Sequence, residues 1–209
     1  MGVVALVLVG VYFSVAFGLR TWLQYRRTGD SGFRGLSGRV GSAEWWGGVL
    51  FIVAMIAAIG GPVADLAGLG AVAAFDVSWV QVVGVVLTLA GILATFAAQV
   101  SMGNSWRIGV DANESTDFVT GGAFAFVRNP IFTAMGLTGL GLVLVVPNVV
   151  SIAGLLTLLV ALQMQVRGVE EPYLRHQHGA RWDEYAARVG RFVPGLGISR
   201  SLSPNERRR

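Results

Sequence analysis

The chain has 209 residues, of which 54% are hydrophobic and only 13% are charged, and its formal net charge is +4. Soluble domains usually carry about 25% charged residues, so this composition excludes an ordinary soluble protein and indicates an integral membrane protein. Cysteine is absent, which excludes disulfides, thiolate metal sites and cysteine nucleophiles.

The positive charge comes entirely from arginine, because the sequence contains no lysine. These arginines bracket hydrophobic segments and do not form a basic patch interleaved with aromatic residues, as a nucleic-acid surface would. We therefore expect membrane lipid, and no nucleic acid, among the partners of the chain.

Five stretches approach the length of about 20 apolar residues that a membrane-spanning helix needs. The first has no basic segment before it and is too long for a signal peptide, so we expect it to be retained. A short Pro147-Asn148 turn between the last two predicts a tight antiparallel hairpin. The five predicted spans are Val3–Leu23, Trp45–Leu66, Ser78–Ser101, Pro130–Val146 and Val149–Val166.

The arginines all fall on one side of these predicted spans. Cytoplasmic loops carry an excess of arginine and lysine, so the N-terminus is expected outside and the C-terminus in the cytoplasm, in the inner (plasma) membrane of a bacterium. The arginines that fix this orientation are Arg20, Arg26, Arg27, Arg34, Arg39, Arg107, Arg128, Arg167 and those that follow Arg167.

The predicted fold class is therefore all-α, a membrane bundle of about five transmembrane helices. Close helix packing is suggested by a row of small residues in the third span, Ala90, Ala94 and Ala98, and by the glycines of the fourth span, Gly136, Gly139 and Gly141. We expect one membrane domain over residues 1–198, with N-terminal spans over 1–100 and a ligand-binding half over 101–198. Residues 199–209 form a basic tail that is expected to be disordered.

A further helix is predicted on the cytoplasmic side, from about Pro172 to Val189. It would lie at the membrane interface and use its apolar residues as membrane or core contacts. Those residues are Tyr173, Leu174, Trp182, Tyr185 and Val189.

Two polar segments flank the third and fourth spans. Met102–Arg107 contains Gly103, which permits close backbone approach to a ligand, and Trp106, which can anchor or stack at an interface. In the second segment Pro130 suits the first turn of a helix and Asn129 its N-cap, so capping alone could explain both. Arg128 beside that helix N-terminus suggests an anion site, although an arginine here also satisfies the positive-inside pattern.

The third polar segment follows the fifth span. If that helix continues, Arg167 shares a face with Glu170 and Glu171, and an internal ion pair is one explanation for the three residues. Two adjacent carboxylates nevertheless exceed what one arginine neutralises, so at least one is left for a cationic ligand. No metal site is expected in this segment.

The order of these segments carries a resemblance. Gly103-Asn104-Ser105-Trp106, then Thr120-Gly121-Gly122 before Arg128-Asn129-Pro130, then Glu170-Glu171 before Gly179, Tyr185, Arg191 and Pro194 resemble the isoprenylcysteine carboxyl methyltransferase and phospholipid methyltransferase superfamily. These are membrane enzymes that use S-adenosylmethionine. The similarity covers roughly residues 100–195.

The resemblance implies a cofactor pocket at the cytoplasmic interface and a tunnel between helices for a lipophilic substrate. One of Glu170 and Glu171 would hold the cofactor ammonium, while Arg128, or N–H groups near Pro130, would hold its carboxylate. The resemblance also makes Gly103, Trp106, Asn129, Phe132 and Tyr185 cofactor-binding candidates, with Trp106 and Phe132 flanking the adenine. The catalytic candidates are Arg167, which would orient an anionic acceptor, and Asn129.

The chain departs from the usual Arg-His-Pro-x-Tyr motif of that superfamily. Asn129 replaces the histidine and can hydrogen-bond but not titrate, and Phe132 keeps the ring of the tyrosine without its hydroxyl. An acceptor that is already an anion needs no base. The expected activity is methyl transfer to a lipophilic acceptor, such as an isoprenoid or prenylcysteine carboxylate or a phospholipid amine. The alternatives are an NADPH-dependent enzyme like the sterol reductases and a non-catalytic membrane protein.

Overall fold

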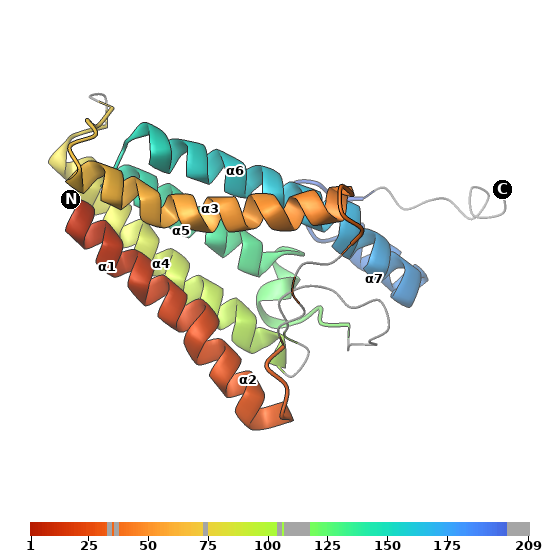
Figure 1. Cartoon of the computed structure of the whole chain (residues 1–209). Coiled ribbons are helices and arrows are strands. Elements are labelled where there is room, and N and C mark those ends of the chain that lie inside the picture. The colour runs from red at the N-terminus through yellow and green to blue at the C-terminus, as the bar shows by residue number, and fades with distance from the viewer. Residues whose placement is uncertain (33–34, 36–37, 73–74, 104–105, 107–117, 200–209) are drawn as a thin grey trace.

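The computed structural model of the chain describes residues 1–32, 35, 38–72, 75–103, 106 and 118–199. Arg34, Asn104, Ser105, Arg107 and the basic tail after Ser199, all used in the sequence analysis, lie outside them. The described residues form helices joined by short connections (Figure 1). The α-helices are α1 (Gly2–Phe13), α2 (Arg20–Thr28), α3 (Ala43–Leu66), α4 (Ser78–Ser101), α5 (Pro130–Val145), α6 (Val149–Gln165), α7 (Glu171–His178) and α8 (Ala180–Ala186). The π-helices are η1 (Ser14–Leu19) and η4 (Val166–Glu170), and η3 (Gly122–Ala125) is a 3₁₀-helix.

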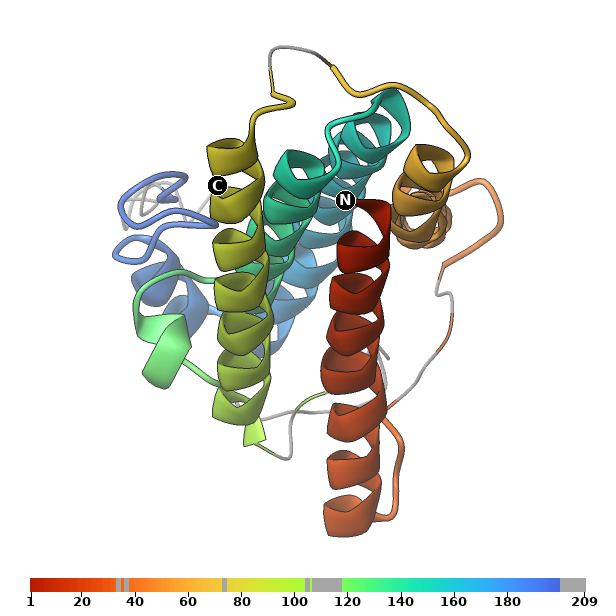
Figure 2. The same cartoon turned by 90° about the vertical axis from the view of Figure 1, so that its left-hand side faces the viewer.

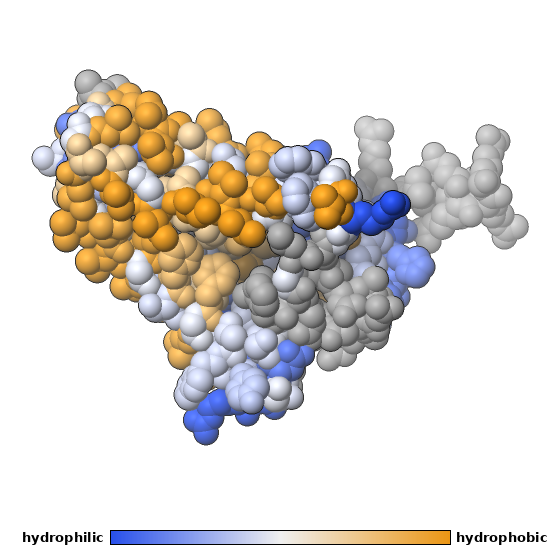
Figure 3. Space-filling view, in the orientation of Figure 1, coloured by the Kyte–Doolittle hydropathy of each residue, from blue (hydrophilic) through white to orange (hydrophobic). Residues whose placement is uncertain are grey.

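The apolar helices confirm the expected all-α membrane bundle. Four helical stretches are long and apolar enough to cross a membrane, and α5 is a shorter apolar helix. The first stretch joins α1, η1 and α2, and the last joins α6, η4 and α7. Apolar residues cover the part of the molecule built by the spans, and hydrophilic residues gather beyond it (Figure 3). The protein is therefore an integral membrane protein.

Helices α5 and α6 form the predicted hairpin, and its turn is held by a buried asparagine. The side chain of Asn148 accepts a hydrogen bond from the Ser151 N–H at 2.9 Å, which caps α6. Its amide nitrogen also donates to the Gly61 carbonyl of α3 at 2.8 Å. One fully buried side chain thus satisfies a helix end and ties the hairpin to α3.

Close packing between α4 and α5 occurs at glycines, including the predicted Gly141, and the predicted alanine row contributes one buried residue. A Cβ on Gly84 would lie 2.7 Å from the Val145 backbone nitrogen, so α4 approaches α5 closely at this glycine. Ala90 and Ala94 are exposed on the outside of α4, and only Ala98 is buried. The prediction was wrong for the first two because lipid is as apolar as a neighbouring helix, so hydrophobicity alone does not identify the packed face.

The predicted interfacial helix from Pro172 to Val189 is divided in two at Gly179. That residue has a φ of +50°, which favours glycine, and it separates α7 from α8. Arg175 and Asp183 form an ion pair at 3.1 Å across the break. The predicted core contacts of this region are confirmed, since Trp182 and Tyr185 are buried and pack with Phe118, Leu174 and Val189.

The N-terminal end of α1 is hydrogen-bonded to α3. The Gly2 N–H donates to the Asp65 carboxylate at 2.8 Å, which joins the start of α1 to the end of α3. Figure 1 shows the two helices diverging from that contact, and Figure 2 shows α1 running alongside α4. A hydrophobic core joins these helices, and its buried residues include Tyr12, Ala54, Ile92, Met135 and Leu158.

Candidate functional site

The site at the arginine-rich end is held together by a C-terminal strap, residues 190–197, lying along the start of α5. Val127 and Gly190 form a parallel bridge, and the Arg128 N–H donates to the Gly190 carbonyl at 2.8 Å. The Thr133 hydroxyl donates to the Phe192 carbonyl at 2.8 Å. These bonds fix the strap against the helix N-terminus that was predicted to bind an anion.

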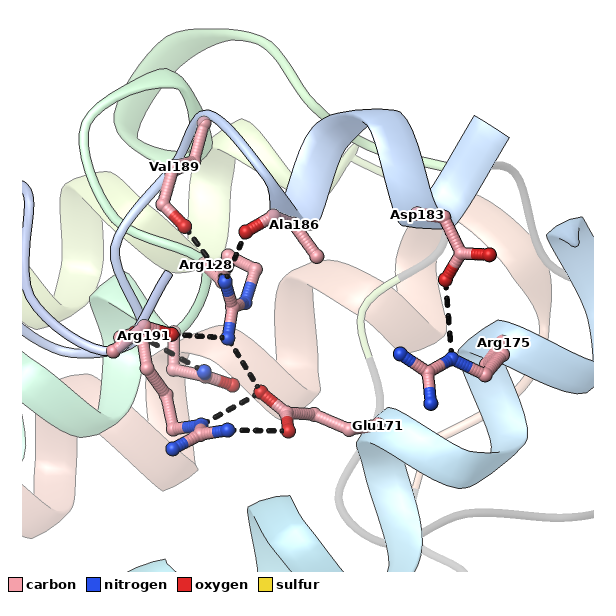
Figure 4. A network of polar contacts seen from close by, with 9 residues as sticks. Arg128, Glu171, Arg175, Asp183, Ala186, Val189 and Arg191 are labelled. Atoms are coloured by element: carbon pink, nitrogen blue, oxygen red, sulfur yellow. Dashed lines mark hydrogen bonds and ion pairs between the residues drawn. The ribbon is translucent and has the colours of Figure 1, made fainter. Parts of the chain in front are cut away.

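Arg128 lies at the centre of this arrangement, with only 1% of its side chain exposed (Figure 4). One terminal nitrogen donates to the Ala186 and Val189 carbonyls at 2.9 and 2.7 Å. The other donates to the Glu171 carboxylate at 2.9 Å and to the Gly197 carbonyl at 3.0 Å. All four terminal N–H groups are therefore used inside the protein, which leaves Arg128 unsuited to hold a cofactor carboxylate.

Glu171 is held by a second arginine as well. Arg191 donates through Nε and Nη2 to the two carboxylate oxygens, at 2.7 and 2.8 Å. This paired geometry is the strongest form of an arginine–carboxylate contact. The hydrogen bond to Glu171 raises the pKa of the Arg191 guanidinium. The network of Arg128, Glu171 and Arg191 joins α5, α7 and the strap.

Glu170 contrasts with its neighbour. Within the described part of the chain its carboxylate has neither a hydrogen bond nor an ion pair, although the residue is only partly exposed. The sequence alone did not distinguish the roles of Glu170 and Glu171. In the structure the Glu171 carboxylate pairs with two arginines. The Glu170 carboxylate is available to a cationic ligand.

The predicted alignment of Arg167 with the glutamates does not occur. Arg167 is exposed, and among the described residues it forms no ion pair with either carboxylate. The physical reason is the π-helical turn η4, which widens the helix between Val166 and Glu170. Widening changes the residues per turn and so rotates Glu170, three positions on, away from Arg167, while Arg128 and Arg191 take the Glu171 carboxylate.

The start of α5 is built as the sequence predicts, with one difference. Asn129 occupies the N-cap position and Pro130 the first turn, but the Asn129 side chain makes no capping hydrogen bond. Its amide instead donates to the Arg191 carbonyl at 3.1 Å. Phe132 is partly buried and packs against the central core.

The two aromatic cofactor candidates outside α5 are both buried. Trp106 is 3% exposed and the Arg20 guanidinium lies 4.6 Å from its ring centre, so the ring offers no open face to an adenine. The Tyr185 hydroxyl donates to the Phe124 carbonyl at 2.6 Å. Burial raises the pKa of Tyr185 to about 12, so this phenol is a structural hydrogen-bond donor at neutral pH.

Two arginines missed in the sequence analysis have important roles. Arg191 was noted only as part of a motif, although it clamps Glu171 from 20 positions away. Arg20 was assigned only to membrane orientation, but it is 1% exposed and donates to the Gly103 carbonyl at 2.7 Å. The signal for Arg20 was its spacing from Tyr12 and Gln24, which places all three on one helix face.

An apolar cavity of about 50 Å³ lies among α1, α3, α5 and α6. Tyr12 and Phe13 line it from α1, Met55 from α3, Met135 from α5 and Leu158 from α6. Several of these residues belong to the same core as Phe132. The cavity therefore adjoins, through one continuous apolar cluster, the start of α5.

Comparisons with known proteins bear on the family of the chain. Residues 79–181 match the family model of the phospholipid methyltransferases, a segment that runs from α4 into the start of α8. The chain is also 27% identical over 132 residues to the nickel-cobalt-cadmium resistance protein NccN of Alcaligenes xylosoxydans xylosoxydans, covering 62% of this chain and 58% of that protein. The matched residues 79–181, which contain the predicted motifs up to Gly179, are thus similar to the phospholipid methyltransferase family.

Proposed function

We propose that the protein transfers a methyl group from S-adenosylmethionine to a lipophilic acceptor at the cytoplasmic face of the membrane. The match to the phospholipid methyltransferase family model supports methyl transfer as the reaction. The clustering of arginines at one end of the spans supports the cytoplasmic face, through the positive-inside rule. The observation that carries the proposal is the difference between the two carboxylates: Glu171 is neutralised by two arginines, while Glu170 has no partner among the described residues.

The residues present fit a cofactor that carries an ammonium, a carboxylate and a sulfonium. Glu170 supplies the carboxylate that pairs with the ammonium. The first turn of α5 supplies N–H groups for the carboxylate, at Ile131 and Phe132, because a helix N-terminus favours an anion. This assignment replaces Arg128, whose terminal nitrogens are occupied. When bound, the cofactor supplies a methyl group activated by the positive sulfur.

The role of the chain is then mainly alignment. Glu171, clamped by Arg128 and Arg191, keeps the backbone of Glu170 in place beside the strap. The apolar cluster that joins Phe132 to the cavity excludes water and receives the apolar part of the acceptor. Well-aligned reacting groups can lower a barrier by roughly 7–11 kcal/mol, so an in-line displacement needs no further catalytic group when the acceptor is an anion.

Asn129 and Arg167 hold different places in this proposal. Asn129 stays a candidate for contact with the cofactor, because only its amide nitrogen is hydrogen-bonded, to Arg191. Arg167 is exposed at the end of the last span. We propose that it attracts an anionic acceptor or lipid headgroup to this face, and that it does not touch the transferred methyl.

An NADPH-dependent reductase is less well supported. Such an enzyme needs free cations for the additional phosphates, and both Arg128 and Arg191 are engaged by Glu171. The name of the Alcaligenes relative refers to resistance to nickel, cobalt and cadmium. The described residues contain no group of three His, Asp or Glu side chains able to hold a metal ion, and we propose no metal site.

Methyl transfer can be tested directly with the purified full-length protein in lipid nanodiscs. Incubation with methyl-labelled S-adenosylmethionine and a bacterial lipid extract is expected to place label in the organic phase. Glu170→Gln should abolish most of this transfer, while Glu184→Gln, on the exposed face of α8, should retain it. Absence of labelled lipid with the wild-type protein, over a panel of phospholipid, isoprenoid and phenolic acceptors, would contradict the proposal.

A further inference from the structure

A stripe of buried polar side chains runs along the interface between the first helix and α4. Ala16 and Gln99 face each other, since the Gln99 amide donates to the Ala16 carbonyl at 2.9 Å, and Arg20 meets Gly103 in the same way. Both pairs are separated by 83 positions in the chain. The two helices therefore run parallel in a constant register, and the same register sets Tyr12 opposite Thr95.

Polar atoms on this stripe lack partners. Among the described residues, the Gln99 side-chain oxygen Oε1 and the Arg20 Nε are buried without a hydrogen bond, and the hydroxyls of Tyr12 and Thr95, which lie close to each other, have no other partner. The four residues are between 1% and 6% exposed. A buried polar group without a partner costs about 1–3 kcal/mol, and polar residues within a membrane bundle usually mark a functional site. Four such residues on one interface are compatible with a hydroxylic occupant, either a ligand or water.

The chemistry of the four atoms defines what they would bind. Arg20 Nε is a donor, the Gln99 oxygen is an acceptor, and the two hydroxyls serve as either. An anion would be repelled by the Gln99 oxygen and by the carbonyls at the end of α4, to which Arg20 already donates. A group that both donates and accepts hydrogen bonds, such as a hydroxyl, is compatible with all four atoms.

Tyr12 connects this stripe to the apolar cavity. Its ring lines the cavity among α1, α3, α5 and α6, and its hydroxyl lies near Thr95, on the α4 side. The first helix also widens to the π-helix η1 directly after this point, and π-helical turns occur frequently at functional sites. Tyr12 therefore lines the apolar cavity with its ring and forms the polar pair with Thr95 through its hydroxyl.

We propose that Tyr12 and Thr95 form a binding site for the hydroxyl group of a lipophilic ligand that enters the bundle at the cavity. Gln99 and Arg20 extend the site towards the arginine-rich end as a polar path between the helices. The proposal rests on the proposed function only in making this ligand the methyl acceptor. Internal water is the other hydroxylic occupant, and the experiment separates the two.

The test compares 4-nonylphenol with its methyl ether 4-nonylanisole, which keeps the shape but cannot donate a hydrogen bond. Thermal unfolding of the full-length protein in detergent, without cofactor, gives the affinity for each probe. The phenol is expected to bind about three- to tenfold more tightly than the ether, because one hydrogen bond is gained. Equal affinities would overturn the proposal and leave water as the occupant.

A double variant, Tyr12→Phe with Thr95→Val, removes both hydroxyls and little else. Its preference for the phenol should fall to about one. Thr88→Val is the matched control, because Thr88 is buried on the same helix but its hydroxyl already donates to the Gly84 carbonyl at 2.8 Å; this variant should keep the preference. A preference that survives in the double variant would place the hydroxyl elsewhere and overturn the assignment.

These measurements are independent of methyl transfer. A phenol preference without any transfer in the lipid assay would contradict the proposed function and leave the hydroxyl site standing. Methyl transfer without a phenol preference would contradict the hydroxyl site and leave the proposed function standing.

Discussion

Two buried polar regions of this protein differ in how completely they are satisfied. In the network of Arg128, Glu171 and Arg191, every terminal N–H of Arg128 and both carboxylate oxygens of Glu171 have partners, and the Arg128 Nε is the one buried side-chain atom there without a partner among the described residues. Along the stripe of Tyr12, Thr95, Gln99 and Arg20, each side chain has an atom without one among the described residues. The comparison indicates that the network holds the fold together and that the stripe is prepared for a ligand.

The largest expected effect is the loss of the network's central carboxylate. Glu171→Gln leaves two arginines without their counterion, one of them buried, and removing one partner of a buried ion pair costs about 3–5 kcal/mol. Thermal unfolding in detergent should show a large drop in midpoint temperature. Glu184→Gln is the control on the exposed face of α8 and should unfold like the wild type. A Glu171→Gln protein of unchanged stability would show that the network is dispensable.

Replacing one tyrosine by phenylalanine in each region compares the two regions under matched burial, because Tyr12 and Tyr185 are both 6% exposed. Tyr185→Phe removes a hydroxyl that donates to the Phe124 carbonyl and should cost about 1 kcal/mol. Chemical or thermal unfolding of the purified variant measures this loss. A neutral result would mean that the short hydrogen bond contributes nothing net.

Tyr12→Phe has the smallest expected effect and the opposite tendency. It removes a hydroxyl whose one neighbour among the described residues is the Thr95 hydroxyl, so stability in the absence of ligand should stay within about 0.5 kcal/mol of the wild type or rise. The same unfolding assay applies. A loss as large as that of Tyr185→Phe would show that the Tyr12 hydroxyl is already bonded, which would remove the basis of the hydroxyl site.

The sequence predicted those features that depend on local pattern. Apolar length identified the spans, and Pro147-Asn148 identified the hairpin turn. The aromatic residues Trp182 and Tyr185 were correctly expected to be buried. In each case the physical cause, either burial or turn geometry, acts over a few neighbouring residues.

Features that depend on distant partners or on helix phase were not predictable in the same way. The π-helical turn η4 rotates Glu170 away from Arg167, and the spacing of the residues in the sequence does not indicate that turn. The bond from Arg191 to Glu171 requires the strap to fold back on α5. Ala90 and Ala94 matched a packing motif but face outwards, since a motif of small residues does not specify which side meets a helix.

The most direct test of the account is the affinity of the purified protein for S-adenosylhomocysteine, measured by calorimetry for the wild type and for Glu170→Gln. A charged hydrogen bond is worth about 1.5–3 kcal/mol, so the account predicts that Glu170→Gln binds the cofactor product at least about tenfold more weakly, with an unchanged unfolding temperature. Equal affinities of the two proteins, or no binding by the wild type, would contradict the claim that Glu170 is the carboxylate left free for a cofactor.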